Sequence, residues 1–137
     1  MFEALQGELT ALRRDLHTHP ELGFQETRTS SRVAGMLEAL GIEVHRGIGS
    51  TGLVGILNGQ RNESGRMIGL RADMDALPVQ ETNQFAHASS RPGLMHACGH
   101  DGHMTMALGA AKLLAEEGAF SGRAVFVFPP NEEHGEG

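Results

Sequence analysis

The chain has 137 residues, of which 39% are hydrophobic, and a formal net charge of −6. This length fits one small domain or part of a larger one, and the hydrophobic fraction is well above that of disordered chains. The acidic balance argues against nucleic acid as a partner, and no run of about 18 apolar residues is present to cross a membrane. Since the N-terminus lacks a signal-peptide pattern and one cysteine cannot form an internal disulfide, we expect a cytoplasmic protein.

Two amphipathic helices are expected in the N-terminal third. Apolar residues recur at steps of three and four, which predicts a helix of about four turns that ends at Pro20. This stripe consists of Phe2, Leu5, Leu9, Leu12 and Leu16. A second helix is expected over about residues 26–40, with Val33, Leu37 and Leu40 facing inward and Gly41 as its C-terminal stop.

Short strands are expected next. Residues 42–44 and 53–57 flank a glycine-rich turn, which predicts a hairpin or two short strands. Residues 67–71 predict a buried strand that ends at residues 73–75. Residues 79–92 have no hydrophobic periodicity, so we expect a loop there.

A third helix is expected to begin near Asp101 and to end at Gly118. Its buried face would carry Met104, Leu108, Ala111 and Ala115. Residues 124–128 form a continuous apolar strand that Pro129 and Pro130 stop. The strand–helix–strand order favours an α/β sheet covered on both faces, with functional residues just after the carboxyl ends of its strands.

Residue types that bind transition metals gather in residues 95–103. Cys98, the only cysteine, lies two positions before His100; a thiolate and an imidazole are ligands for zinc and its neighbours, and this spacing lets both reach one ion. Asp101 and His103 strengthen this interpretation, although Asp101 could instead be a helix N-cap and His103 a surface residue. The alternative for the pair is a small buried cysteine beside a helix-capping histidine.

Two pairs of carboxylates follow predicted strands. Because neighbouring side chains point apart, one of Glu132 and Glu133 could bind a metal while the other takes a proton from activated water; the alternative is a solvated acidic tail. Asp73 and Asp75 are two positions apart, so both can face one cleft, and a carboxylate there could hold a ligating imidazole. A turn that ends the strand is the alternative.

His17 and His19 have the spacing of a metal-binding pair. They also lie at the end of an amphipathic helix, where histidines interact favourably with the C-terminal dipole. We favour this second interpretation.

In sequence order, four segments resemble the aminoacylase/carboxypeptidase superfamily of metallopeptidases, and most closely its branch of hippurate hydrolases, indoleacetyl-amino-acid hydrolases and N-acyl-amino-acid amidohydrolases. The segments are residues 13–24 (RRDLHTHPELGF), 70–78 (LRADMDALP), 95–103 (MHACGHDGH) and the pair Glu132-Glu133 after a hydrophobic strand. Together they extend over nearly the whole chain, which makes the resemblance specific.

The resemblance implies an α/β fold, the N-terminal part of a dinuclear-metal, aminopeptidase-like catalytic domain with a mostly parallel sheet flanked by helices. It implies two divalent ions (zinc, manganese, nickel or cobalt), with Cys98, His100 and Glu133 as ligands. Glu132 would be the general base, and Asp75 would steady a ligating group. The substrate would be a small N-acyl amino acid, and the enzyme a homo-oligomer.

Two features depart from the family pattern. Pro129-Pro130-Asn131 replaces the usual Gln-Pro-Ala before the paired glutamates, which could shift the loop carrying Glu132. The chain also ends at Gly137, before the family's further histidine ligands, its inserted dimerisation domain and its C-terminal catalytic strands. We therefore expect residues 1–137 to be the N-terminal portion of a catalytic domain, inactive alone. The competing hypothesis is a truncated, non-catalytic remnant that forms a small α/β oligomer; a structural zinc module fits poorly because such sites need four Cys or His ligands.

Overall fold

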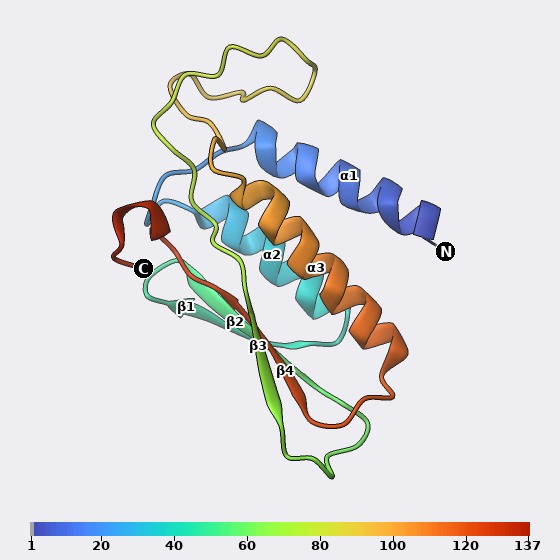
Figure 1. The fold of residues 1–137 in the computed structure, drawn as a ribbon. Coiled ribbons are helices and arrows are strands. Elements are labelled where there is room, and N and C mark those ends of the chain that lie inside the picture. Colours follow the sequence, from blue (N-terminus) through green and yellow to red (C-terminus); the bar gives the residue numbers. More distant parts are fainter. Residues whose placement is uncertain (1) are drawn as a thin grey trace.

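Three α-helices lie on one side of a four-stranded sheet in the computed structural model, which describes residues 2–137 (Figure 1). The elements are, in order, α1 (Phe2–Thr18), α2 (Thr27–Ala39), β1 (Glu43–Ile48), β2 (Gly52–Asn58), β3 (Met67–Arg71), α3 (His100–Glu117), β4 (Arg123–Phe128) and the 3₁₀ turn η1 (Glu132–His134). Every helix and strand expected from the sequence is thus present. Among these residues, no helix combines the length and apolarity that a membrane crossing requires.

The sheet has the strand order β1-β2-β4-β3. β1 and β2 form the expected hairpin, β2 pairs antiparallel with β4, and β3 pairs parallel with β4 after the crossover through α3. The α/β class is confirmed. This part of the sheet is nevertheless mixed rather than mostly parallel, because the hairpin adds two antiparallel pairings to the single parallel one.

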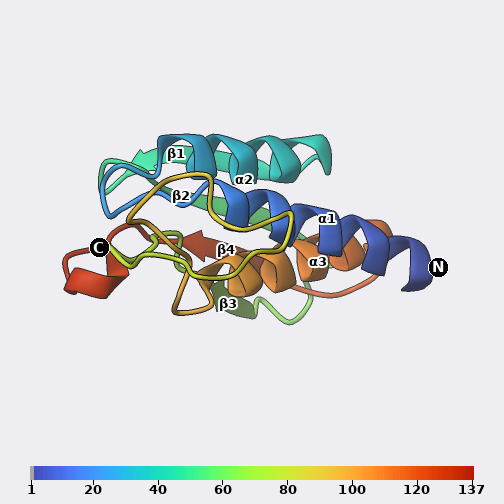
Figure 2. The same cartoon turned by 90° about the horizontal axis from the view of Figure 1, so that it is seen from above.

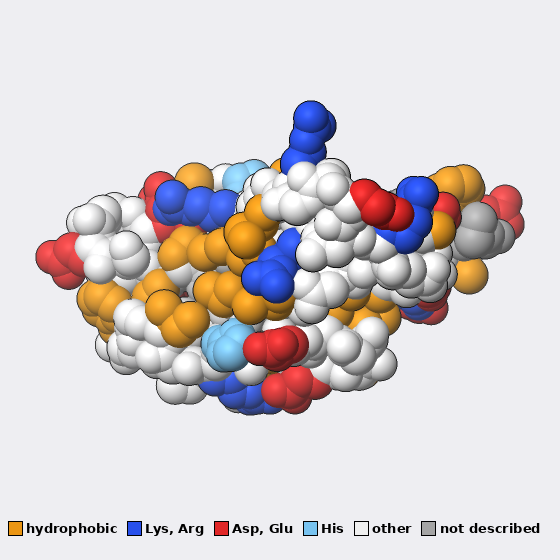
Figure 3. All heavy atoms as spheres, turned by 90° about the horizontal axis from the view of Figure 1, so that it is seen from below, with side chains coloured by type: hydrophobic (Ala, Val, Ile, Leu, Met, Phe, Trp, Pro, Cys, Tyr) orange, Lys and Arg blue, Asp and Glu red, His pale blue; other side chains and the backbone are white. Residues whose placement is uncertain are grey.

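The expectation of a sheet covered on both faces is wrong for residues 2–137. Ala124, Phe126 and Phe128 of β4 point toward the helices and are buried, whereas the alternating Val125 and Val127 on the other face are only half-buried. All the helices lie on the first of these faces (Figure 2). Hydrophobic side chains therefore remain visible on the underside of the molecule (Figure 3).

β3 was expected to be buried, and this expectation is also wrong. Met67 is 64% exposed and Ile68 is 63% exposed. The reason is that β3 is an edge strand, paired only with β4 in the described residues, while α3 lies over β4. The apolar character of this segment identified a strand correctly but did not reveal its neighbours.

Helix termini follow the local sequence. Glu21 caps α2 from outside the helix: its carboxylate accepts hydrogen bonds from the backbone N–H groups of Arg28 and Thr29, at 3.2 and 2.7 Å. These are donors that a helix cannot satisfy internally. α3 ends at the expected Gly118, which has a left-handed conformation with φ of 65°.

The predicted buried faces of two helices are only partly confirmed. On α1 only Leu12 and Leu16 of the apolar stripe are buried, and on α3 the expected Ala115 is half-buried.

A long connection joins β3 to α3, and its middle part, residues 79–98, is called loop 79–98 below. As expected, it has no regular helix or strand. It extends past the C-terminal end of α1 (Figures 1 and 2). At its base, Leu77 and Met95 exchange backbone hydrogen bonds, and farther out Ser90 donates through its N–H and hydroxyl to the Thr18 carbonyl.

Candidate metal centre

Three segments converge beyond the carboxyl ends of β3 and β4. Asp73 and Asp75 follow β3, Cys98 precedes α3, and Glu132 and Glu133 lie on η1 after β4. Because β3 and β4 are parallel, their carboxyl ends meet at one edge of the sheet. The sequence therefore brings its candidate residues together through strand direction.

His100 is the centre of this group and is only 3% exposed. Its Nδ1 lies 2.8 Å from the backbone oxygen of Asp75. A carbonyl oxygen can only accept, so Nδ1 carries the proton and Nε2 presents its lone pair. Nε2 faces three carboxylates, at 3.4 Å from Glu132 Oε2, 3.6 Å from Glu133 Oε1 and 4.0 Å from Asp73 Oδ2. This is the tautomer and orientation of a metal-ligating histidine.

Two sets of ligand atoms meet at that nitrogen. One set is Cys98, His100 and Glu133, and the other is Asp73, His100 and Glu132; within each, the ligand atoms lie within 4.8 Å of one another. One imidazole lone pair binds one ion, so His100 can complete only one set. The carboxylates of the other set remain available to a second, adjacent ion.

The electrostatics of the site fit a cation. Glu133 Oε1 and Asp75 Oδ1 are buried without a hydrogen-bond partner in the described part of the chain, which is costly for carboxylate oxygens. A hydrogen bond to Glu133, then burial, then the nearby carboxylate charges raise the pKa of the Cys98 thiol. A divalent ion reverses this balance because it favours the thiolate. The donor set of sulfur, nitrogen and oxygen suits zinc and neighbouring transition metals.

Asp75 connects two members of the first set. Its Oδ2 accepts a hydrogen bond from the backbone N–H of Glu133 at 3.0 Å, and its Oδ1 lies 3.3 Å from His100 Nδ1. Asp75 is 1% exposed, so these contacts are held in a packed environment. This geometry suits the orienting role expected for Asp75.

The segment Pro129-Pro130-Asn131 leaves Glu132 beside His100. Asn131 is 4% exposed and has a left-handed backbone with φ of 52°. Its side chain packs against Gly23, where a Cβ would lie 1.7 Å from Asn131 Oδ1. The departure from the family pattern therefore does not move η1 away from the cluster.

Four further candidates lie outside both ligand sets: His17, His19, Asp101 and His103. Asp101 contacts His17 and Arg13 instead, and it is not the N-cap of α3, which is Gly99. His103 is exposed, with its ring 5.9 Å from that of His100. The ring of His19, just beyond the end of α1, bonds the backbone oxygen of Asp15 on that helix.

Sequence reasoning gave no role to several buried polar groups near the centre. Glu26 is fully buried, and burial raises the pKa of its carboxyl. His96 is 4% exposed with both ring nitrogens unpartnered among the described residues, and burial lowers its pKa to about 4. Glu81 is buried against His17. No local pattern marks these residues, because each is defined by distant neighbours.

Comparison with known proteins gives consistent matches. Residues 69–137 match the sequence model of Peptidase family M20/M25/M40. The chain is 49% identical over 129 residues to the hippurate hydrolase of Campylobacter jejuni, covering 94% of this chain and 33% of that protein. It is 44% identical over 135 residues to the N-acyl-L-amino acid amidohydrolase of Geobacillus stearothermophilus, covering 97% and 36%. The chain thus spans about a third of the length of these relatives.

A solved structure shares the fold. It is the YxeP protein of Bacillus subtilis, described as a dinuclear metal binding peptidase from the M20 family. The TM-score is 0.89 at 41% identity, covering 96% of this chain and 36% of that one.

Proposed function

The chain belongs to peptidase family M20/M25/M40, and from that premise we propose that it supplies the metal centre of a hydrolase that cleaves the amide bond of small N-acyl amino acids. The observation that carries the proposal is the free Nε2 of His100 facing Glu133 and Glu132, with Cys98 in the same ligand set. The names of the relatives support the substrate class.

Cys98, His100 and Glu133 would hold one divalent ion, and Asp73 lies where it can contribute to a second. When bound, the ions act as Lewis acids and make water nucleophilic near neutral pH. Zinc, manganese, nickel and cobalt are all compatible with this donor set. The backbone oxygen of Asp75 keeps the proton of His100 on Nδ1, and its carboxylate binds the Glu133 backbone N–H. Asp75 thereby orients both proposed ligands toward the same ion.

Glu132 is the general base in this proposal. Its side chain is 36% exposed, so it can meet water and substrate, whereas that of Glu133 is 18% exposed. The carboxylate of Glu132 takes a proton from the attacking water, whose oxygen bonds to the acyl carbon. The C–N bond then breaks, the amide nitrogen receives the proton from Glu132, and a carboxylate and a free amino acid leave.

Residues 1–137 are, in this proposal, the N-terminal portion of the catalytic domain of a homo-oligomeric enzyme, without turnover of their own. The exposed edge strand β3 supports this, because an unpaired strand edge favours further pairing. A non-catalytic remnant that forms a small oligomer through the same edge is the second candidate.

The decisive experiment uses the protein at its natural length, established by intact mass spectrometry from its own cells. The purified protein is stripped with a chelator, reloaded with each metal, and assayed for amino acid release from hippurate and N-acetyl amino acids. We expect metal-dependent release, and a loss of roughly 10²–10⁴-fold in kcat for Glu132→Gln. Glu116→Gln, an exposed change on α3, is the matched control. Full activity after metal removal, or an active Glu132→Gln variant, would sink the proposal.

A further inference from the structure

A buried charge network lies outside the two ligand sets, at the C-terminal end of α1. The side chain of His17, in the last turn of that helix, is 5% exposed. Its Nδ1 is 2.8 Å from Asp101 Oδ2, and its Nε2 is 3.1 Å from both carboxylate oxygens of Glu81. One imidazole therefore bridges two carboxylates that are themselves almost fully buried, at 1% and 2% side-chain exposure.

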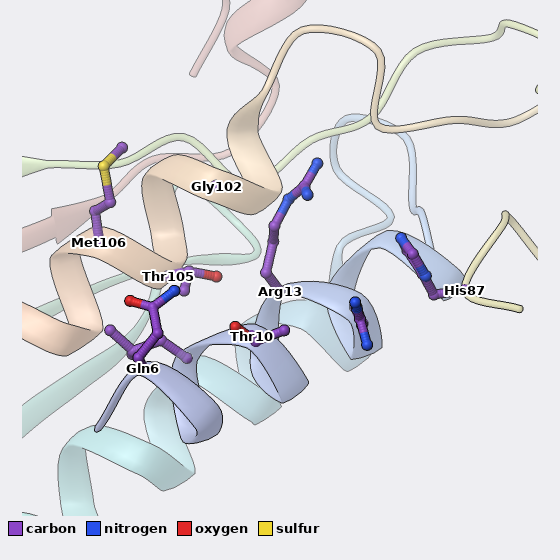
Figure 4. A pocket seen from close by; sticks show the side chains of 9 residues that line it. Gln6, Thr10, Arg13, His87, Gly102, Thr105 and Met106 are labelled. Atoms are coloured by element: carbon purple, nitrogen blue, oxygen red, sulfur yellow. The ribbon is translucent and has the colours of Figure 1, made fainter. Parts of the chain in front are cut away.

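Both carboxylates have further hydrogen-bond or ion-pair partners besides His17. Arg13 Nε lies 3.3 Å from the same Asp101 oxygen that faces His17. Figure 4 shows Arg13 extending from α1 toward the first turns of α3. Burial acts to raise the pKa of Glu81, but hydrogen bonds from the Ser89 N–H, Asn83 and His17 outweigh it, and the pKa lies below its ordinary value. Each ring nitrogen of His17 thus faces a buried carboxylate that is also held by other groups.

Along the sequence, the two partners of His17 flank the candidate ligands Cys98 and His100. Glu81 is near the start of loop 79–98, the loop that ends at Cys98, and Asp101 directly follows His100. Through the Ser89 N–H, 2.7 Å from Glu81 Oε1, the same network reaches the outer part of the loop. Because the loop has no regular helix or strand, contacts of this kind help to fix its place, together with its backbone hydrogen bonds to Leu77 and Thr18.

We propose that His17 is a positioning residue for the metal centre: a buried side chain that links loop 79–98 to the first turn of α3 and so sets the place of Cys98 beside His100. The metal-binding consequence rests on the proposed function, whereas the anchoring of the loop does not. Removing one partner of such a buried bridge leaves the others as uncompensated charges, so small changes at His17 have large local effects.

Two substitutions separate the two halves of the bridge. An asparagine amide nitrogen falls near the place of Nδ1, so His17→Asn keeps the bond to Asp101 and loses that to Glu81. A glutamine amide nitrogen falls near Nε2, so His17→Gln does the reverse. His19→Gln is the matched control, because His19 lies two residues on and contacts the backbone and side chain of the half-buried Asp15 instead.

Three measurements on the protein at its natural length follow. For His17→Asn, hydrogen exchange at the Ser89 amide should quicken at least tenfold, since a charge-assisted anchor is lost. For both variants, alkylation of Cys98, followed by peptide mass spectrometry, should quicken roughly threefold or more, as its thiol moves away from the Glu133 carboxylate that lies beside it. The thiolate-to-Co²⁺ absorption band of the wild type should weaken in both variants and persist in the control.

Unchanged alkylation of Cys98 in folded His17→Asn and His17→Gln chains would overturn the positioning role, whatever happens with cobalt. A wild-type chain that binds no Co²⁺ would refute the metal centre, and the alkylation rates would still decide whether His17 positions Cys98. If both variants fail to fold, as judged by circular dichroism, Glu81→Gln makes the same test, since it removes only the charge of the loop-side partner. Equal rates for that variant and the wild type would also overturn the proposal.

Discussion

Substituting Gly23 by alanine tests how the chain places the paired glutamates. A Cβ at residue 23 would lie 1.7 Å from Asn131 Oδ1 and 2.5 Å from its Cγ. Non-bonded carbon and oxygen atoms approach to about 3.3 Å, so Asn131 must retreat by roughly 1.5 Å. Asn131 cannot yield freely, because it is buried in a left-handed conformation and its Oδ1 lies 3.1 Å from His134 Nδ1.

The displacement should reach the metal centre, because Glu132 and the proposed ligand Glu133 follow Asn131 in the chain. Metal–ligand distances tolerate changes of only about 0.2 Å, so a shift of roughly 1.5 Å exceeds that tolerance severalfold. We expect Gly23→Ala to weaken Co²⁺ binding at least tenfold, as changes in supporting groups commonly do. Overpacking should also lower the free energy of unfolding by about 1–3 kcal/mol.

The assay is a Co²⁺ titration followed by absorbance, together with urea unfolding of the same samples. Gly35→Ala is the control, since Gly35 lies within α2 and a Cβ there meets nothing within 4 Å. That change should leave metal binding intact and raise stability by about 0.4–1 kcal/mol. Should Gly23→Ala bind Co²⁺ within twofold of the wild type, the contact with Asn131 does not govern the position of the paired glutamates, and the reasoning is wrong.

Three further predictions concern single carboxyl groups. Asp75→Asn should weaken metal binding by about 10–100-fold, measured by calorimetric titration, because one amide oxygen cannot replace both carboxylate contacts; binding equal to the wild type would contradict it. Glu21→Ala should lower the free energy of unfolding by about 1–2 kcal/mol in urea, since α2 loses its N-terminal acceptor, and an unchanged midpoint would refute the cap. Glu26→Gln should stabilise the chain at neutral pH: burial raises the pKa of Glu26, so its ionisation opposes folding above that pKa. This gain should vanish below the unfolded pKa of 4.5, and a gain independent of pH between 4 and 8 would count against the reasoning.

Local patterns predicted the secondary structure well because helices and strands depend on near neighbours. The three- and four-residue spacing located α1, and Gly41 and Gly118 marked helix ends correctly. The same reasoning failed for the burial of β3. An apolar segment has the same sequence pattern at the edge of a sheet as between two other strands, and β3 lies at the edge. It also placed helices on both faces of the sheet, because the continuous apolar run of β4 does not distinguish its buried face from its half-buried one.

The chemistry of the candidate ligands could also be predicted, because it belongs to the residue types themselves. Cys98, His100 and Glu133 were candidates by side chain alone, and the fold brings them within one ligand set. The second set, with Asp73, was not foreseen, although the two-residue spacing to Asp75 placed both near one cleft.

What the sequence by itself determined is therefore the order of the elements, the identity of the metal-binding side chains and the likeness to a family. The tertiary structure alone decided which groups meet. His17 reaches Asp101 across 84 residues and Glu81 across 64, and Asp75 reaches the Glu133 backbone across 58. Periodicity and spacing describe residues that are close along the chain, whereas these pairs exist only because packing and parallel strand direction bring distant segments together.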